Sequence, residues 1–91
     1  MALLLIPTAL RLYTDGLSEV HENGNTVGEV IHSLAAQYTD LKKHLFNDAG
    51  KLRSFVNVYL NEEDIRQKNG LDTPVTKSDT IMLIPSIAGG L

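Results

Sequence analysis

Two glycines near the carboxyl end, Gly89 and Gly90, are the residues of this sequence that best fit a chemical role. They follow a predicted strand and Pro85, and residues 86–90 carry no charge. Because glycine has no β-carbon, a Gly-Gly segment can lie extended in a channel only as wide as a backbone and present a main-chain carboxylate to an enzyme. At about 3.3 Å per residue, residues 86–90 span roughly 16 Å. We interpret this segment as a substrate arm, with a terminus that has no function as the alternative.

The other chemically capable side chains do not form a catalytic or metal-binding pattern. The histidines His21, His32 and His44 are 11 and 12 positions apart, so they form no local ligand set. Cysteine is absent from the sequence, which excludes disulfides, thiolate metal sites and a cysteine nucleophile. The run Glu62-Glu63-Asp64 is typical of a solvated loop, with docking to a basic partner as the alternative and acid–base catalysis disfavoured. We therefore predict a protein that is not an enzyme and holds no cofactor or metal.

The composition predicts one domain with a compact core. The sequence has 91 residues, and 43% of them are hydrophobic. Eleven acidic and eight basic residues give a net charge of −3, which argues against binding to nucleic acid or an anionic membrane and favours basic or neutral protein partners. The apolar run at residues 3–6 stops at Pro7 and is too short for a signal or spanning segment. We therefore expect a cytoplasmic protein.

The elements that position the glycine pair begin with two predicted strands. Residues 3–13 are rich in Leu and Ile, and the pair Asp15-Gly16 follows them. This pattern predicts a first strand that ends in a tight hairpin turn. A second, short strand over residues 17–22 is expected at an edge of the sheet.

One helix is predicted between the strands. Thr26 and Glu29 have the spacing of a capping box, in which each side chain accepts a hydrogen bond at the start of a helix. The apolar positions that follow repeat at helical spacing and form one buried stripe: Val27, Val30, Ile31, Leu34, Ala35 and Tyr38. Residues 40–45 are predicted to add one short helical turn.

The second half of the chain contains the clearest strand patterns. Residues 55–60 alternate, so that aliphatic side chains share one face and Phe55 and Tyr59 the other. A short strand follows the acidic turn, and residues 80–84 form the last strand, where Pro85 is predicted to stop the pairing. The order predicts an α+β fold, a mixed sheet with one main helix packed on one face. We assign residues 1–85 to this domain and residues 86–91 to a flexible tail.

A specific spacing surrounds the glycine pair: Asp79 precedes Pro85 by six positions, and Pro85 precedes Gly89-Gly90 by four, while Asn61 forms a turn after the predicted strand at residues 55–60. With these residues the whole chain resembles the ubiquitin-like sulfur carriers of the β-grasp fold. That family includes the small subunit of molybdopterin synthase and the sulfur carrier of thiamine biosynthesis. The resemblance is greatest to the carrier of the thiocarboxylate-dependent cysteine pathway, through residues 6–8, 10–11, 50–52, 55–57, 59, 61–66 and 88–90.

This resemblance implies that Gly90 is the reactive residue. An ATP-dependent adenylyltransferase of the ubiquitin-activating type would adenylate its carboxylate, and a sulfur donor would then form a thiocarboxylate. The segment Ile87, Ala88 and Gly89 would be recognised by the enzymes that bind the tail. In the cysteine pathway a pyridoxal-phosphate cysteine synthase-like enzyme accepts the sulfur, and a zinc peptidase processes the tail. The carrier is a cosubstrate. A carrier of the molybdopterin synthase type, and a ubiquitin-like modifier conjugated through Gly90, remain the alternatives.

The sequence departs from the family pattern at Leu91, one residue past the expected terminal glycine. While Leu91 is present, the carboxyl group of Gly90 is part of a peptide bond and cannot be adenylated. We expect a peptidase to cleave between Gly90 and Leu91. The alternatives are a protein without carrier activity and a β-grasp interaction domain with an inert tail.

A partner is expected to dock on the sheet face that the helix does not cover. If the inward positions of the last two long strands fill the core, Tyr59, Met82 and Ile84 remain outside, joined by Phe55. An exposed apolar patch of this kind often marks a protein interface. Coverage by long loops or by a second copy of the chain is the alternative.

Overall fold

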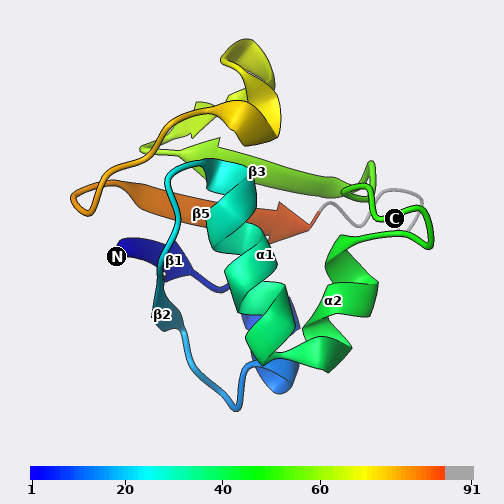
Figure 1. The fold of residues 1–91 in the computed structure, drawn as a ribbon. Helices are drawn as coiled ribbons and strands as arrows, with labels where there is room; N and C mark the ends of the chain where they lie inside the picture. The colour runs from blue at the N-terminus through cyan, green and yellow to red at the C-terminus, as the bar shows by residue number, and fades with distance from the viewer. Residues whose placement is uncertain (86–91) are drawn as a thin grey trace.

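The computed structural model describes residues 1–85, which form one sheet covered on one face by two helices (Figure 1). The strands are β1 (Ala2–Leu5), β2 (Glu19–Glu22), β3 (Val56–Leu60), β4 (Glu63–Asp64) and β5 (Thr80–Pro85). The helices are α1 (Val27–Gln37) and α2 (Thr39–Leu45), with 3-10 segments η1 (Thr8–Tyr13), η2 (Ile65–Gln67) and η3 (Gly70–Asp72). Within the described residues the strand order is β2-β1-β5-β3-β4. Strand β5 pairs parallel with β1 and antiparallel with β3. The predicted mixed α+β sheet is confirmed.

The prediction of a first strand over residues 3–13 was wrong. Strand β1 ends at Leu5, and the rest of the apolar run forms η1. Pro7 precedes η1 and accepts a hydrogen bond from the Leu10 N–H at 2.9 Å, while Arg11 Nε donates to the Ile6 carbonyl at 3.0 Å. A dense run of leucines satisfies strand and helix patterns alike, so periodicity could not place this boundary. The expected edge position of β2 is confirmed, since it pairs with β1 at one end of the sheet order.

Helix α1 begins at the predicted capping box. The Glu29 N–H donates to Thr26 Oγ1 at 3.2 Å, as expected. The Glu29 carboxylate accepts from the Asn25 N–H at 2.9 Å, one residue before the expected donor. The predicted stripe of α1 is buried except for Tyr38, which is half-buried at the end of the helix. The short helix predicted at residues 40–45 is present as α2.

The core lies between the inner face of the sheet and α1. Leu4 of β1 and Ile81 and Leu83 of β5 are fully buried, and they belong to the same cluster as the α1 stripe. Alternation along β3 and β5 therefore sends the intervening side chains to the opposite face of the sheet. No helix among residues 1–85 is long and apolar enough to cross a membrane.

The last strand was predicted to end at Ile84, with Pro85 stopping the pairing, but it includes Pro85. Pro85 is the last residue of β5 and lies opposite Val56 of β3. A proline at the end of a strand loses only its N–H donor and keeps an extended backbone, so Pro85 itself still pairs in register. Strand β5 thus leads toward Gly90 from between its two neighbours, β1 and β3.

Candidate functional site

The predicted site has two parts, and only one of them falls within the described residues. Ile87, Ala88, Gly89, Gly90 and Leu91 lie outside residues 1–85. The other part consists of Phe55, Tyr59, Met82 and Ile84, which we call the outer patch.

Three members of the outer patch share the sheet face opposite α1 and α2. Tyr59 and Met82 lie directly opposite each other in the β3–β5 register, and Ile84 lies opposite Asn57. Phe55 directly precedes β3 and is 42% exposed, while Ile84 is 38% exposed. Tyr59 and Met82 are half-buried. The structure therefore brings these apolar side chains to the surface beside the strand that leads to the glycine pair.

A hollow of about 300 Å³ adjoins the outer patch at its Met82 side. It is lined by Leu5, Asn61, Glu62, Thr80 and Met82. Sequence reasoning missed Leu5, because the first strand was predicted to continue through Tyr13. Leu5 lies opposite Met82 in the parallel β1–β5 pair, so a strand ending at Pro7 would have placed Leu5 on this face.

The side chain of Asn61 has a structural role, because it forms hydrogen bonds with Asp79 and Thr80. Asn61 and Glu62 both have positive φ, at 50° and 77°, which suits the tight connection between β3 and β4. Asn61 Nδ2 donates to Asp79 Oδ1 at 2.8 Å, and the Thr80 N–H donates to Asn61 Oδ1 at 2.9 Å. Hydrogen bonds from Asn61 and from the Thr76 N–H lower the pKa of Asp79. The side chain of Asn61 thus fixes the start of β5 against the end of β3.

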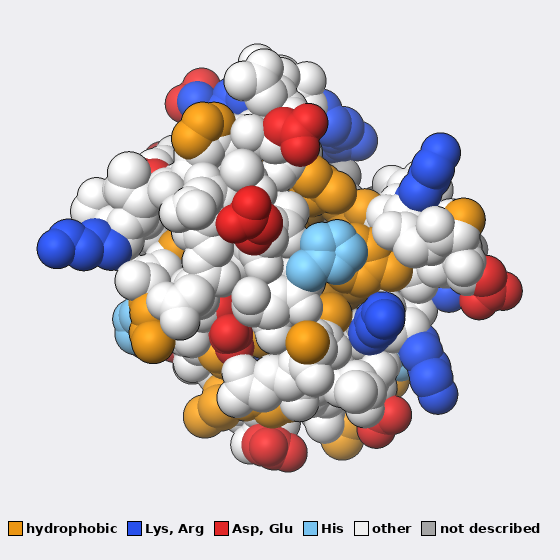
Figure 2. Space-filling view, in the orientation of Figure 1, with side chains coloured by type: hydrophobic (Ala, Val, Ile, Leu, Met, Phe, Trp, Pro, Cys, Tyr) orange, Lys and Arg blue, Asp and Glu red, His pale blue; other side chains and the backbone are white. Residues whose placement is uncertain are grey.

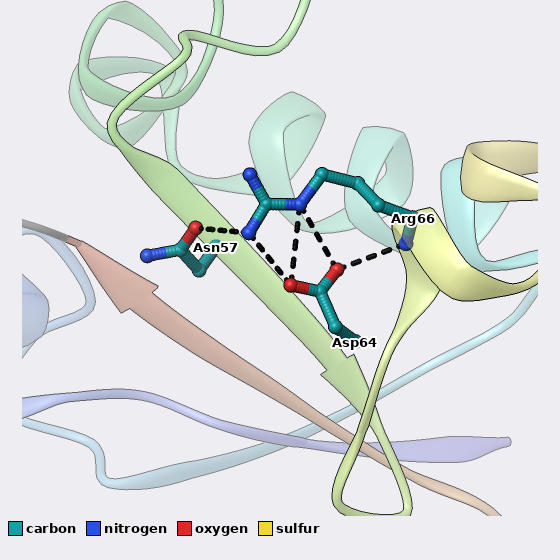
Figure 3. Close-up of polar contacts among 3 residues, drawn as sticks. All are labelled: Asn57, Asp64 and Arg66. Atoms are coloured by element: carbon teal, nitrogen blue, oxygen red, sulfur yellow. Dashed lines mark hydrogen bonds and ion pairs between the residues drawn. The ribbon is translucent and has the colours of Figure 1, made fainter.

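The acidic run after Asn61 does not form a catalytic carboxylate pair. Asp64 accepts hydrogen bonds from the backbone N–H, Nε and Nη2 of Arg66, the last at 2.6 Å, and Arg66 Nη2 also donates to Asn57 Oδ1 at 2.8 Å (Figure 3). These bonds to Arg66 lower the pKa of Asp64, whereas a general acid needs a raised one. Glu63 pairs with Lys68 at 3.2 Å. The prediction of a solvated turn holds for Asn61 and Glu62 but was wrong for the end of the run, because Glu63 and Asp64 form β4 and the Asp64 side chain is only 16% exposed. The short strand predicted after the acidic run is therefore formed by its last two residues, and η2 follows it.

The three histidines are exposed, and two of them stack on aromatic rings. His44 of α2 stacks on Tyr13 of η1 with ring centroids 4.1 Å apart, and His32 of α1 stacks on Phe46 at 4.6 Å. Among residues 1–85, no group of three or more His, Asp and Glu side chains is placed to hold a metal ion. These rings connect elements on the helical side of the molecule.

Comparison with known proteins finds similar sequences and structures that cover nearly the whole chain. The sulfur carrier protein CysO of Mycobacterium tuberculosis is 41% identical over 87 residues, which cover 93% of this chain and 94% of that protein. A chain in the crystal structure of the Amycolatopsis orientalis BexX/CysO complex has a TM-score of 0.87 at 38% identity and covers 99% of this chain and 100% of its own length. Small archaeal modifier protein 1 of Methanosarcina acetivorans has a TM-score of 0.88 at 28% identity, covering 98% and 95%.

These similarities confirm the β-grasp fold and the resemblance that the sequence indicated. Residues 4–90 match the ThiS family, so the match includes both the folded body and the glycine pair. The chain therefore belongs to the ThiS family of ubiquitin-like β-grasp proteins.

Proposed function

We propose that this chain is a sulfur carrier protein that carries sulfur as a thiocarboxylate at Gly90. The observation that carries the proposal is the family match over residues 4–90, which joins the β-grasp body to the Gly-Gly sequence. The 41% identity with a sulfur carrier protein over most of the chain supports the same role. In this role the protein is a cosubstrate of other enzymes.

The chemistry at Gly90 requires activation because a carboxylate is a poor electrophile. An ATP-dependent adenylyltransferase would join the carboxylate to AMP and release pyrophosphate. A sulfur donor would then displace AMP, leaving sulfur in place of one carboxylate oxygen. Glycine at positions 89 and 90 leaves the backbone free of side chains, so a narrow channel can admit it.

Activation at Gly90 depends on removal of Leu91, because the last carboxylate otherwise belongs to a leucine. We assign this step to a peptidase, for which a zinc enzyme is the expected class. The recipient of the sulfur is then a pyridoxal-phosphate cysteine synthase-like enzyme, in which an activated serine loses its leaving group to give an aminoacrylate and the thiocarboxylate sulfur adds to that aminoacrylate. The relatives named CysO are the reason for preferring cysteine over the molybdopterin-type destination.

The test of the carrier role is intact mass spectrometry. We compare the full chain with a chain that ends at Gly90, each incubated with ATP, the host adenylyltransferase and a sulfur donor. The chain ending at Gly90 should gain the mass difference between sulfur and oxygen, and the full chain should do so only after host extract has removed Leu91. A chain ending at Gly90 whose mass stays unchanged would sink the proposal.

A ubiquitin-like modifier is the second candidate function, favoured by the structural similarity to a small archaeal modifier protein. Both functions use the same adenylation, but their products differ. A modifier joins Gly90 to lysines of other proteins, and those conjugates survive on a denaturing gel as a ladder. A carrier yields thiocarboxylate on the free protein and no ladder.

The outer patch is the proposed docking surface for these enzymes. Replacing Ile84 with Asp places a charge where a partner must remove water, so we expect partner binding to weaken by at least about tenfold. Ile84 is exposed, so circular dichroism and the melting temperature should remain close to those of the parent chain. Loss of folding would instead assign Ile84 to the core.

A further inference from the structure

The basic side chains of this acidic protein are distributed unevenly. Residues 6–17 and 39–55 together contain five of the eight basic residues but only three of the eleven acidic ones, so these two segments have a net charge of +2 and the remaining residues −5. The five cations, which we call the basic collar, are Arg11, Lys42, Lys43, Lys51 and Arg53. The net charge of the whole chain, −3, conceals this separation.

Specific contacts hold the two segments of the collar together. Tyr13 of η1 stacks on His44 of α2 at 4.1 Å. Arg53 Nε donates to the Lys43 carbonyl at 2.9 Å, and the Arg53 N–H donates to the Leu45 carbonyl at 2.8 Å. The loop after α2 is therefore fastened to the end of that helix, and α2 to η1.

The collar lies at the end of the sheet where β5 finishes. On the β3 side, Arg53 accepts a hydrogen bond from the N–H of Val56, which is opposite Pro85. On the β1 side, Arg11 Nε donates to the carbonyl of Ile6, the residue after β1, which runs parallel to β5. The Arg53 backbone is thus bonded to the β3 residue opposite Pro85, and the Arg11 side chain is bonded to the residue just after β1. Figure 1 shows α2 and its following loop at the end of the sheet toward which β5 runs.

Three of the five collar cations are exposed, Arg11 and Arg53 are half-buried, and none of the five forms an ion pair within the described part of the chain. Lys42, Lys43 and Lys51 are exposed, and Figure 2 shows basic side chains grouped over the side of the molecule where α2 and its following loop lie. The ion pairs found among residues 1–85 are Arg66–Asp64 and Lys68–Glu63, neither of which includes a collar residue. The acidic residues of these two segments, Asp15, Asp40 and Asp48, are exposed as well.

We propose that the basic collar docks against an acidic surface of the activating enzyme, formed by Asp and Glu side chains around the entrance to the channel that receives Gly90. This inference rests on the proposed carrier function. Attraction between the basic collar and an acidic enzyme surface accelerates the encounter of the two proteins. The rest of this molecule is negatively charged and is repelled by the same acidic surface, so the two proteins approach in one preferred orientation. The expectation of a basic or neutral partner, drawn from net charge, is thereby revised for this end of the protein.

The experiment compares charge reversals at the two ends of the molecule. The collar variants are K42E/K43E and, separately, K51E in the loop after α2. The matched control is K77E, an exposed lysine in the loop that precedes β5, at the opposite end of that strand. Each substitution is made in a chain ending at Gly90, and the rate of thiocarboxylate formation with the host adenylyltransferase is followed by intact mass.

At low ionic strength we expect the collar variants to raise KM by about tenfold with kcat unchanged, and K77E to leave both close to the parent values. The difference should shrink as salt is raised, because added ions screen exposed charges. Equal KM values for collar variants and control, with circular dichroism confirming that all are folded, would overturn the inference while leaving the carrier function intact. Absence of thiocarboxylate in the unsubstituted chain would overturn the proposed function itself.

Discussion

At the scale of single residues, Asp64 and Asp79 show how polar side chains fix the turns around the sheet. Each carboxylate accepts hydrogen bonds that lower its pKa, Asp64 from Arg66 and Asp79 from Asn61 and Thr76. Asp79 anchors the start of β5 through Asn61, and Asp64 holds Arg66 beside Asn57 of β3. Both ionised groups therefore favour the folded state.

Stability should accordingly decrease in acid. Because the folded pKa of each group lies below its unfolded value, about 3.9, the folded state binds fewer protons, and its stabilising contribution is complete above that value and is lost as pH falls through the folded pKa. We expect the free energy of unfolding, measured by urea denaturation, to fall between about pH 5 and pH 2. The D64N/D79N variant should show a shallower decrease. Identical slopes for the variant and the parent would contradict the prediction.

The ionisation of Glu22 has the opposite effect on the free energy of unfolding. Burial raises its pKa, and Oε2 has no hydrogen-bond partner within the described residues. Ionisation of Glu22 therefore disfavours the folded state at neutral pH, and this penalty disappears when the carboxyl group is protonated. The comparison of parent and D64N/D79N removes this effect because both proteins retain Glu22.

At the scale of elements, local patterns predict some boundaries well and others poorly. The capping box at Thr26 and the alternation along β3 depend on neighbouring residues, and both are present in the structure. The end of β1 depends on the hydrogen bond from Arg11 to the Ile6 carbonyl and on the packing of η1. The spacing of apolar residues in the sequence indicates neither of these. The parallel pairing of β1 with β5 joins residues from opposite ends of the chain and likewise has no local signal.

The cap of α1 gives a direct test at this scale. Replacing Thr26 with Ala removes the acceptor for the Glu29 N–H and should lower the free energy of unfolding by about 1 kcal/mol. Thr39, the first residue of α2, is the matched control, because its side chain makes no hydrogen bond within the described residues. T39A should change stability by less than about 0.5 kcal/mol. Equal losses in the two variants, measured by urea denaturation, would show that the cap has no specific role.

At the scale of the whole molecule, the sequence predicted the fold and the outer patch but not the separation of charge. Alternation was enough to place Tyr59, Met82 and Ile84 outside the core, because β3 and β5 are adjacent. The basic collar was missed because its members come from η1, α2 and a loop that only the folded chain brings together. Net charge averages over such arrangements and therefore does not show the excess of basic residues in these segments.

The domain boundary is also a property of the whole molecule. Among residues 1–85, the buried core cluster runs from Ala2 to Leu83, and β5 ends at Pro85. We therefore expect a chain ending at Pro85 to fold and to melt within about 2 °C of the full chain, a shift that corresponds to less than about 0.5 kcal/mol for a domain of this size. Differential scanning calorimetry measures the melting temperature of the two chains. A much lower melting temperature for the shorter chain would place part of residues 86–91 within the folded unit.

The parallel alignment of β1 and β5 has a mechanical consequence. Force applied between the start of β1 and the end of β5 acts along both strands in opposite directions, so the hydrogen bonds between them are loaded together in shear. The bonds between β1 and β5 then resist as a group, whereas strands pulled apart from one end separate one bond at a time. A pull on the end of β5 while the start of β1 is held is therefore resisted by all of these bonds at once.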